Sequence, residues 1–381
     1  MIQHLLLLPL AAAASLYATH YSGSVYTLSL DASATRPTLR LAHDQPLCGG
    51  MPSWLTLDPT QPVIYCSDET GDATTNGTLS ALTIGPDGRL AAQAKTSAPG
   101  GGVHSVIYAG DSGRYLAIAH YGGSAVSTYR LPLRPNDPPL QVFRYRLSHP
   151  GAKPQQDAPH PHQVLVDPTG GVLVAPDLGA DLVRVYAIDR RSGRLAPCPG
   201  IAFPAGEGPR HGVFVGQGAA TTLYVDTELG GHVFAFAVSY GRGDGCPAFR
   251  RTQAMVPYPG RGLPAGASLA EIRPAGEQLY VSVRTDQAFA PDDSLATLDR
   301  SRNGTVSFRA LTSSRGKVPR TFVVNAAGDR VAIGNQASAT VVVVRRDVRT
   351  GALGAELARL QVGQPGQVGT STGLSSVIWV E

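Results

Sequence analysis

The sequence predicts an all-β fold, a seven-bladed β-propeller, and three observations lead to this prediction. A pattern of strand, turn and strand recurs six times along the chain, and a seventh unit is divided between the two ends. The composition, with 44 Gly, 30 Pro and only 16% charged residues, suits short strands and tight turns better than long helices. No shift in composition marks a boundary, so a single domain is expected over residues 15–381.

Residues 1–14 form the first distinct segment of the chain. Leucines fill most of residues 5–10 and alanines follow at 11–14, which is typical of a signal peptide and too short to span a membrane. No Lys or Arg precedes the apolar run, which leaves open a second interpretation, an apolar tail packed under the last blade. A secreted protein that begins near Ser15 is the preferred prediction, and a cytoplasmic protein is the alternative.

The seventh unit is divided between the two ends of the chain. Residues 16–20 and 24–28 read as later strands that lack a first strand, whereas residues 374–380 read as a first strand without a partner. Joining them completes a blade and removes exposed sheet edges. An open solenoid is the alternative, but a solenoid needs capping repeats, so the complementary ends favour a closed ring.

The pattern is clearest at residues 161–179. Apolar residues alternate over 163–166, as in a strand. A turn of sequence Asp-Pro-Thr-Gly follows at 167–170, and an apolar run continues through residue 174. The two strands of a hairpin are antiparallel, so the start of the first and the end of the second lie at one edge of the sheet. His162 and Asp177 are therefore expected to face one shared surface.

Five further units repeat this pattern at intervals of roughly 50 residues, and additional strand-like runs complete four strands per blade. The residues that precede or begin the first strands form one circle at the mouth of the ring: Ser53, His104, His162, Arg210, Ser268 and Arg320. The residues that end the second strands form another circle at the same face: Glu69, His120, Asp177, Glu228, Arg284 and Gln336, with His20 near the seventh position.

Four cysteines and two glycosylation motifs bear on the compartment. Cys48 can pair with Cys66 and Cys198 with Cys246, although four cysteines allow three pairings and four free buried thiols are the alternative. The motifs at Asn76 and Asn303 lie in loop-like stretches and weakly favour secretion.

Several classes of function find no support in the sequence. The net charge is only +4 and no basic run is present, so neither a nucleic acid nor a membrane is an expected partner. No Gly-x-Ser-x-Gly, phosphate-binding glycine loop, Cys-x-x-Cys or His-Glu-x-x-His motif occurs. We expect no cofactor and no metal, because the mouth lacks the carboxylate-rich set of a calcium site. A monomer is expected.

The two circles line the mouth with imidazoles, guanidinium groups and carboxylates, where a propeller ordinarily presents small or apolar residues. Arg210, Arg284 and Arg320 make this mouth electropositive and suited to bind a carboxylate or phosphate with two parallel hydrogen bonds. His104, His162 and Glu228 are candidate proton-transfer groups for a bound lactone or acid. For any single histidine, a structural role remains the alternative.

Five short phrases of the sequence carry a resemblance to known proteins. They are Pro-His-Gln-Val-Leu-Val-Asp-Pro-Thr-Gly at 161–170, Gly-Pro-Arg-His at 208–211, Thr-Glu-Leu at 227–229, Ser-Val-Arg at 282–284 and Pro-Arg-Thr-Phe at 319–322. Together they resemble the seven-bladed lactonase family, which contains propeller-type 6-phosphogluconolactonases and the fungal carboxy-cis,cis-muconate cyclase. The resemblance runs from about residue 16 to the end and implies an enzyme that opens or forms the lactone of a small organic or sugar acid.

The resemblance places the family's proposed catalytic residues on His162, Arg210, Glu228 and Arg284. The residue after Arg210 is a histidine, as in the lactonase branch, where the cyclase has tryptophan, and this favours hydrolysis. The further residues expected to bind the substrate are His104, His211, Arg320, Gln336, Glu69 and Asp177.

The expected mechanism divides the work among these groups. Arg210 and Arg284 clamp the substrate anion and polarise the lactone carbonyl, and His162 moves the proton. Glu228 either orients His162 or is itself the acid. A small-molecule lactone or carboxylate is the expected partner. A muconate-cyclase-type cycloisomerase and a secreted propeller that only binds an acidic or carbohydrate ligand remain the alternatives.

Overall fold

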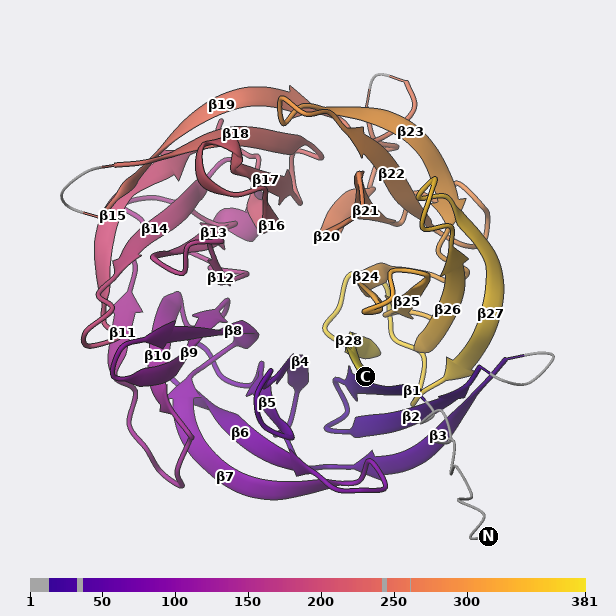
Figure 1. Ribbon diagram of the computed structural model, residues 1–381, viewed down its shortest axis with the longest axis horizontal. Helices are drawn as coiled ribbons and strands as arrows, with labels where there is room; N and C mark the ends of the chain where they lie inside the picture. Colours follow the sequence, from indigo (N-terminus) through magenta and orange to yellow (C-terminus); the bar gives the residue numbers. More distant parts are fainter. Residues whose placement is uncertain (1–13, 33–36, 242–244, 261) are drawn as a thin grey trace, which may run out of the picture.

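A computed structural model of the chain describes residues 14–381, except 33–36, 242–244 and 261. It is a closed ring of seven four-stranded antiparallel sheets around a central channel, which confirms the predicted fold (Figure 1). The signal peptide predicted for residues 1–14 lies almost wholly outside the described residues, which begin at residue 14.

We number the blades in chain order, with blade 7 made from the two chain ends. The first three are blade 1, with β4 (Pro52–Leu57), β5 (Val63–Asp68), β6 (Asn76–Ile84) and β7 (Leu90–Pro99); blade 2, with β8 (Gly102–Gly110), β9 (Gly113–His120), β10 (Ala125–Leu131) and β11 (Gln141–Arg144); and blade 3, with β12 (Leu165–Val166), β13 (Val172–Asp177), β14 (Leu182–Ile188) and β15 (Leu195–Ala202).

The remaining blades complete the ring. They are blade 4, with β16 (Pro209–Val215), β17 (Thr222–Thr227), β18 (Val233–Tyr240) and β19 (Pro247–Met255); blade 5, with β20 (Ser268–Ala275), β21 (Gln278–Arg284), β22 (Ser294–Arg300) and β23 (Val306–Ser313); blade 6, with β24 (Pro319–Val324), β25 (Arg330–Asn335), β26 (Thr340–Arg346) and β27 (Leu353–Gln361); and blade 7, with β28 (Leu374–Val380), β1 (Ala14–His20), β2 (Val25–Asp31) and β3 (Thr38–Gln45). Two short 3₁₀ turns, Pro154–Gln156 and Gly218–Ala220, lie between strands.

The second strand of each blade is packed between the neighbouring blades. Every residue of β5, β13 and β17 is buried, so these strands have continuous apolar runs instead of alternation. The predicted turn before β13 forms as expected, because the Asp167 carboxylate accepts the backbone N–H groups of Thr169, Gly171 and Val172, and Gly170 adopts a positive φ of 68°.

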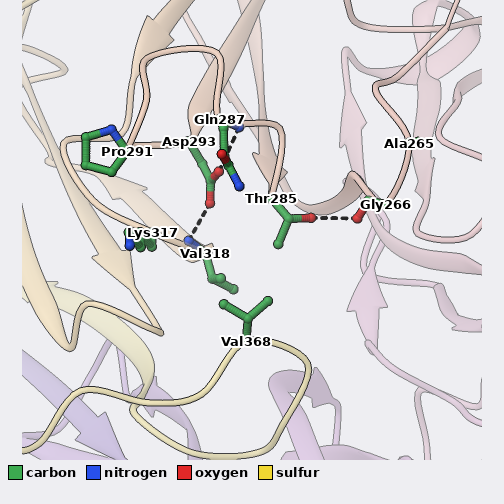
Figure 2. A pocket seen from close by; sticks show the side chains of 9 residues that line it. All are labelled: Ala265, Gly266, Thr285, Gln287, Pro291, Asp293, Lys317, Val318 and Val368. Carbon is green, nitrogen blue, oxygen red and sulfur yellow. Dashed lines mark hydrogen bonds between the residues drawn. The ribbon is translucent and has the colours of Figure 1, made fainter.

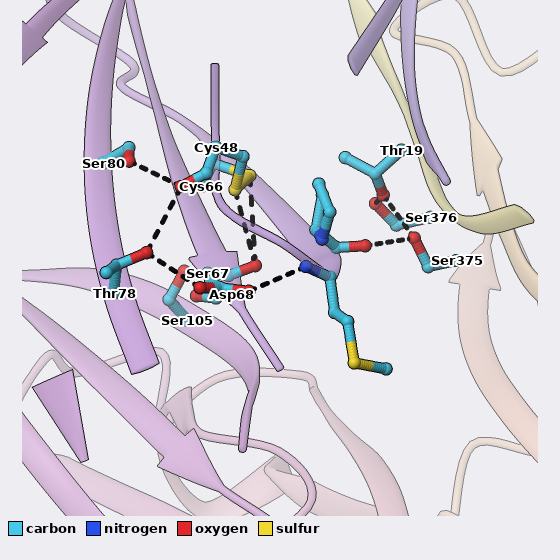
Figure 3. The surroundings of a disulfide bond; sticks show 12 residues. Thr19, Cys48, Cys66, Ser67, Asp68, Thr78, Ser80, Ser105, Ser375 and Ser376 are labelled. Carbon is cyan, nitrogen blue, oxygen red and sulfur yellow. Dashed lines mark hydrogen bonds between the residues drawn. A yellow bond between two sulfur atoms is a disulfide. The ribbon is translucent and has the colours of Figure 1, made fainter. Parts of the chain in front are cut away.

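The two chain ends pair as the sequence predicts. β28 runs antiparallel to β1, with Leu16 opposite Trp379 and Ala18 opposite Val377, so strands from both ends complete blade 7. The Ser375 hydroxyl joins this blade to blade 1 by donating to the Pro52 carbonyl (Figure 3). The ring therefore closes without a free inner edge among the described residues.

Both expected disulfides are present. Cys48 is bonded to Cys66 of β5, and its carbonyl also accepts hydrogen bonds from two hydroxyl groups of β6, which fixes the segment before β4 (Figure 3). Cys198 of β15 is bonded to Cys246, which precedes β19, and this bond links the outer strands of blades 3 and 4.

The two glycosylation motifs differ in their placement. Asn303 lies in a turn, as expected, whereas Asn76 is the first residue of β6 and not part of a loop.

The first strands of blades 1, 2, 4, 5, 6 and 7 each carry a β-bulge close to the mouth of the channel. The register shifts by one residue between Pro52 and Trp54, Gly102 and His104, Pro209 and Gly212, Leu269 and Ile272, Pro319 and Thr321, and Leu374 and Ser376. A bulge lets neighbouring residues escape the alternation of a regular strand, so side chains at these positions are redirected toward the channel.

Blade 3 has a shorter first strand than the sequence indicated, because β12 contains only Leu165 and Val166. The backbone N–H of His162 still donates to the Pro176 carbonyl at 2.9 Å. Pro176 has no N–H to return a hydrogen bond, so the regular ladder ends there. His162 consequently sits on irregular backbone at the mouth.

Candidate active site

A cavity of about 620 Å³ lies at the mouth of the channel, where the first strands begin. Six blades contribute residues to its wall, and members of both predicted circles lie there. Six of the ten residues expected to catalyse or bind line it: Glu69, His162, Glu228, Arg284, Arg320 and Gln336.

The other four predicted residues lie elsewhere. Arg210 is behind Glu228 with only 1% of its side chain exposed, and His104 and His211 are buried, with their rings 5.5 Å apart, outside the cavity wall. Asp177 is fully buried, accepts the backbone N–H of His160 at 2.6 Å and pairs with Arg184. Asp177 therefore does not face the surface that His162 reaches, because its carboxylate turns back into the blade.

Glu228 joins two of the arginines. Its carboxylate lies 2.8 Å from Nε of Arg210 and 2.9 Å from Nη2 of Arg284. Burial acts to raise the pKa of Glu228, but Arg284 and Arg210 outweigh burial and hold this pKa below its usual value. Glu228 is thus ionised at neutral pH and keeps both guanidinium groups in place.

Glu69 makes a similar anchor on the opposite side of the cavity. It accepts hydrogen bonds from the Tyr21 hydroxyl at 2.6 Å and the Ser53 hydroxyl at 2.7 Å, and it lies 3.7 Å from Nη2 of Arg320. The Arg320 guanidinium also lies over the Tyr21 ring, 5.6 Å from its centroid. These contacts fix Arg320 with part of its side chain at the cavity wall.

His162 reaches the cavity as a neutral imidazole. Burial, with the nearby Arg210 and His211, holds the pKa of His162 well below 6.5. Its Nδ1 lies 3.2 Å from Nε2 of His211. Its ring packs edge to face against the Tyr121 ring, with the two ring centroids 5.7 Å apart. Nε2 has no hydrogen-bond partner among the described residues, so it is the nitrogen left for a ligand.

The charges around the cavity favour an anion. Arg210, Arg284 and Arg320 face the two carboxylates of Glu69 and Glu228, and Lys153 adds a further positive charge at the rim. With neutral histidines, positive charge exceeds negative charge, and the guanidinium groups are partly shielded from water.

A second cavity of about 440 Å³ adjoins the first and shares Gly266, Thr285, Val318 and Val368 with it (Figure 2). We call it the side compartment. In Figure 2, the side chains of Val318 and Val368 point toward each other across it. Its wall is mainly apolar, with Lys317 at one end.

The wall of the side compartment is held in an unusual backbone conformation. Thr285, Gln287 and Val318 have positive φ values of 59°, 48° and 59°. The buried carboxylate of Asp293 accepts the N–H of Gln287 at 3.0 Å and that of Val318 at 2.7 Å. A β-branched residue such as Val318 rarely adopts this conformation, so Asp293 maintains a wall that local preferences disfavour.

Several residues of the cavity were not predicted from the sequence. Tyr121 directly follows His120, the residue chosen from the repeat, and a shift of one position would have found it. Lys153 and Gln155 lie between β11 and β12, in the longest of the connections between blades, where the strand pattern of the repeat gives no signal.

The family of the chain is evident from comparison with known proteins. A family model described as lactonase, 7-bladed beta-propeller, matches residues 12–370. The chain belongs to this lactonase family. The resemblance noted in the sequence is therefore confirmed, and enzymes that act on lactones are its family context.

Two relatives illustrate the similarity within the lactonase family. A probable 6-phosphogluconolactonase of Arthroderma benhamiae is 31% identical over 248 residues, which span 65% of this chain and only 61% of that protein. The 6-phosphogluconolactonase of Formosa agariphila is 25% identical over 79% of this chain and 83% of its own length.

A solved structure matches nearly the whole ring. The periplasmic gluconolactonase PpgL of Pseudomonas aeruginosa superposes with a TM-score of 0.77 at 26% identity, and the match covers 97% of this chain and 99% of that one.

Two further features concern the surroundings of the site. Among the described residues, no helix has the length and apolar character needed to cross a membrane. Within the same part of the chain, no three or more His, Cys, Asp or Glu side chains gather in a way that could hold a metal ion.

Proposed function

We propose that this lactonase-family chain hydrolyses a small anionic lactone in the cavity at the channel mouth. The observation that carries the proposal is the presence of a neutral imidazole, His162, in one cavity with two anchored arginines, Arg284 and Arg320. An imidazole that is unprotonated at neutral pH is suited to take a proton from water, and guanidinium groups stabilise an anion.

The proposed reaction needs only these side chains and water. Nε2 of His162 takes a proton from a water molecule while the water oxygen bonds to the lactone carbonyl carbon. The carbonyl π electrons move to its oxygen, where Arg284 and Arg320 stabilise the charge. When the carbonyl re-forms, the ring C–O bond breaks and the imidazolium returns its proton to the leaving oxygen. The product is the hydroxy acid, with one water added.

The roles proposed here differ in part from the sequence-based mechanism. Arg210 is buried behind Glu228, so its role is to hold Glu228 and, through it, Arg284. Glu228 is ionised and makes its contacts with arginines, which supports a positioning role over that of an acid. Tyr121, beside His162 in the cavity wall, is a further candidate to bind the substrate.

The excess of positive charge supports a lactone with a carboxylate or phosphate group. The relatives' names point to 6-phosphogluconolactone and gluconolactone as first substrates to test. The adjoining apolar side compartment further supports a lactone with an apolar substituent that passes Val318 and Val368.

We also propose that residues 1–14 direct export of the chain. Two disulfides support an oxidising compartment, and the structural neighbour from Pseudomonas aeruginosa is named as periplasmic. Cleavage after residue 14 would leave the pairing of β1 with β28 intact from Ser15 onward.

The test is hydrolysis of gluconolactone and 6-phosphogluconolactone, measured as the release of protons by the acid that forms. We expect His162→Gln to lower kcat by roughly 10²- to 10⁴-fold and Arg320→Gln to lower kcat by roughly 10²-fold, because Arg320 stabilises the charge on the carbonyl oxygen. His149→Gln and Arg134→Gln are matched controls, because both side chains are exposed and lie outside the cavity. Folded protein that binds a sugar acid without hydrolysing any lactone, or full turnover by His162→Gln, would contradict the proposal. Formation of a lactone from the acid, measured in the reverse direction, would indicate cycloisomerase chemistry.

A further inference from the structure

Three side chains from three blades form a hydrogen-bonded row that leads from the channel to the cavity. Nδ1 of His211, in β16, lies 3.1 Å from Oε1 of Glu271, in β20. Nε2 of His211 lies 3.2 Å from Nδ1 of His162, just before β12. Glu271 is fully buried, and His211 and His162 are 2% and 5% exposed, so water does not compete for these contacts.

We infer that Glu271 and His211 are positioning residues that fix His162 in the tautomer with a proton on Nδ1 and a lone pair on Nε2. Glu271 is not among the site residues expected from the sequence, and His211 was expected to bind the substrate. The inference deepens the proposed function and rests on it for its catalytic meaning, but the tautomer itself can be measured without any substrate.

The direction of each hydrogen bond follows from Glu271. An ionised carboxylate can only accept, and Arg273, with Nε 3.0 Å from Oε1, favours the ionised form. Although burial raises the pKa of Glu271, Arg273 and His211 lower it by more. His211 must therefore donate through Nδ1–H.

The rest of the row is then determined. Burial lowers the pKa of His211 to about 4 despite the attraction of Glu271, so the ring is neutral at pH 7 and its Nε2 has a lone pair. His162 must supply the hydrogen of the next bond from Nδ1. Because His162 is also neutral, its Nε2 has the lone pair that proton abstraction requires.

The surroundings prevent the His211 ring from turning. Its ring centroid lies 5.9 Å from that of Trp54 and 5.5 Å from that of His104. Its backbone N–H donates to the Asp226 carboxylate at 2.7 Å, and the next N–H, of Gly212, donates to the Gln163 side chain at 2.6 Å. The row is thus built into the packing between blades.

The charged and titratable groups around the row come from six elements. His162 faces His211 and Arg210 of β16, Arg320 of β24 and Tyr121 after β9. Around His211, the neighbouring groups are Glu271 and Arg273 of β20, Arg210 of β16, Asp226 of β17 and His104 of β8. Glu271 is the acidic group that contacts an imidazole ring of the row directly. It is therefore the group whose removal tests the row.

The row has a defined effect on the reaction. When Nε2 of His162 takes a proton, the Nδ1–H bond to His211 becomes charge-assisted, and the Glu271 carboxylate stabilises the imidazolium through the intervening ring. If Glu271 is replaced by Gln, the side-chain amide can donate as well as accept. The row can then reverse, which leaves a hydrogen on Nε2 of His162, where it blocks proton abstraction.

The chain offers a matched control for this variant. Glu207 makes the same kind of contact with His232, Oε2 to Nδ1 at 3.1 Å, outside the cavity wall. If a buried carboxylate and imidazole pair served only to stabilise the fold, Glu271→Gln and Glu207→Gln would affect stability alone and leave the pH profile unchanged.

The first experiment is ¹⁵N NMR of the full chain labelled at histidine, near pH 7, with His162→Gln and His211→Gln used for assignment. We expect both His162 and His211 to be protonated on Nδ1 and not on Nε2. This measurement needs neither a substrate nor a folded Glu271 variant. A hydrogen on Nε2 of His162 in the wild-type chain would overturn the inference, whether or not the chain hydrolyses lactones.

The second experiment compares pH profiles of hydrolysis by the wild type, Glu271→Gln and Glu207→Gln. We expect Glu271→Gln to lower kcat by about 10²-fold or more with little change in KM, and to move the acidic limb to lower pH. An unchanged kcat and acidic limb in folded Glu271→Gln would overturn the inference. If no lactone is hydrolysed while NMR shows the expected tautomers, the proposed function fails and the assignment of the row stands.

Discussion

Replacing Glu228 by Gln distinguishes the two roles that the sequence left open, an acid or a positioning group. Glu228 contacts Arg210 at 2.8 Å and Arg284 at 2.9 Å. Gln has a single acceptor oxygen and no charge, so it can hold only one of these arginines well. We expect Arg284, with 12% of its side chain exposed, to lose its fixed orientation at the cavity.

The size of the effect follows from the contact that is lost. A hydrogen bond to a charged group contributes about 1.5 to 3 kcal/mol, so kcat/KM should fall by roughly 10- to 100-fold, mainly through kcat because Arg284 stabilises the charge on the carbonyl oxygen. Breaking a buried ion pair altogether costs about 3 to 5 kcal/mol, and because Gln retains one acceptor we expect a loss of stability of about 1 to 2 kcal/mol.

The assay is hydrolysis of an anionic lactone from pH 5 to 9, together with urea unfolding at pH 7. The matched control is Glu356→Gln. Glu356 pairs with Arg359 on β27, which lies on the outside of the ring, away from the channel (Figure 1). Since the pKa of Glu228 is held below its usual value, both limbs of the pH profile should match the wild type. A basic limb that disappears in Glu228→Gln would show that Glu228 is the acid and refute the positioning role, because loss of Arg284 alone lowers kcat without changing the shape of the pH profile.

Three further predictions concern the ring and the side compartment. The pKa values of His104, His162 and His211 are lowered in the folded chain, so below pH 6.5 the unfolded chain binds more protons than the folded chain does. The free energy of unfolding should therefore have its full value above pH 6.5 and fall as the pH drops toward 4. In urea titrations at several pH values, His211→Gln should reduce the slope of this free energy against pH by about one proton. The disulfides span 18 and 48 positions, and their reduction should lower the free energy of unfolding by about 3 and 4 kcal/mol. Thiol titration of the denatured, unreduced chain should find no free thiol among the four cysteines. For lactones with alkyl substituents, kcat/KM should rise by about 2-fold per methylene, because about half of the free energy of full burial is gained in the side compartment. Val368 is 58% exposed on the rim, and Val368→Asp should abolish this trend. If kcat/KM of the wild type does not change along the series, the side compartment is not part of the substrate site.

The parts of the fold that recur in the sequence were predictable from it. Strand periodicity and turn residues such as those at 167–170 repeat in every unit, so the number of blades follows from counting. Closure of blade 7 follows from two incomplete ends. Of the three possible cysteine pairings, the observed one was favoured because Cys48 and Cys66 are close in sequence and Cys198 and Cys246 have equivalent places in neighbouring units. Each of these features depends on patterns that repeat along the chain, and such patterns can be recognised in a single sequence.

The orientation of individual side chains at the mouth was not predictable in the same way. Arg210 and Asp177 were assigned to the cavity because of their places in the repeat, yet both are buried against charged partners. Lys153 reaches the cavity from the longest connection between blades, which lies outside the repeated strands. Burial of a guanidinium group or carboxylate depends on a partner from another strand, such as Glu228 or Arg184, and the repeat contains no information about that pairing.

The bulges explain why the site can be built at all from repeating strands. In a regular strand, consecutive residues point to opposite faces, so Arg210 and His211 could not both turn toward the channel side of blade 4. The register shifts between Pro209 and Gly212, and again between Leu269 and Ile272, where Glu271 lies. His211 and Glu271 therefore meet because both occupy bulges. Deleting one residue from either bulge would restore regular alternation and turn one member of the row away, which makes the irregular backbone, and not only the side chains it carries, a requirement for the tautomer of His162.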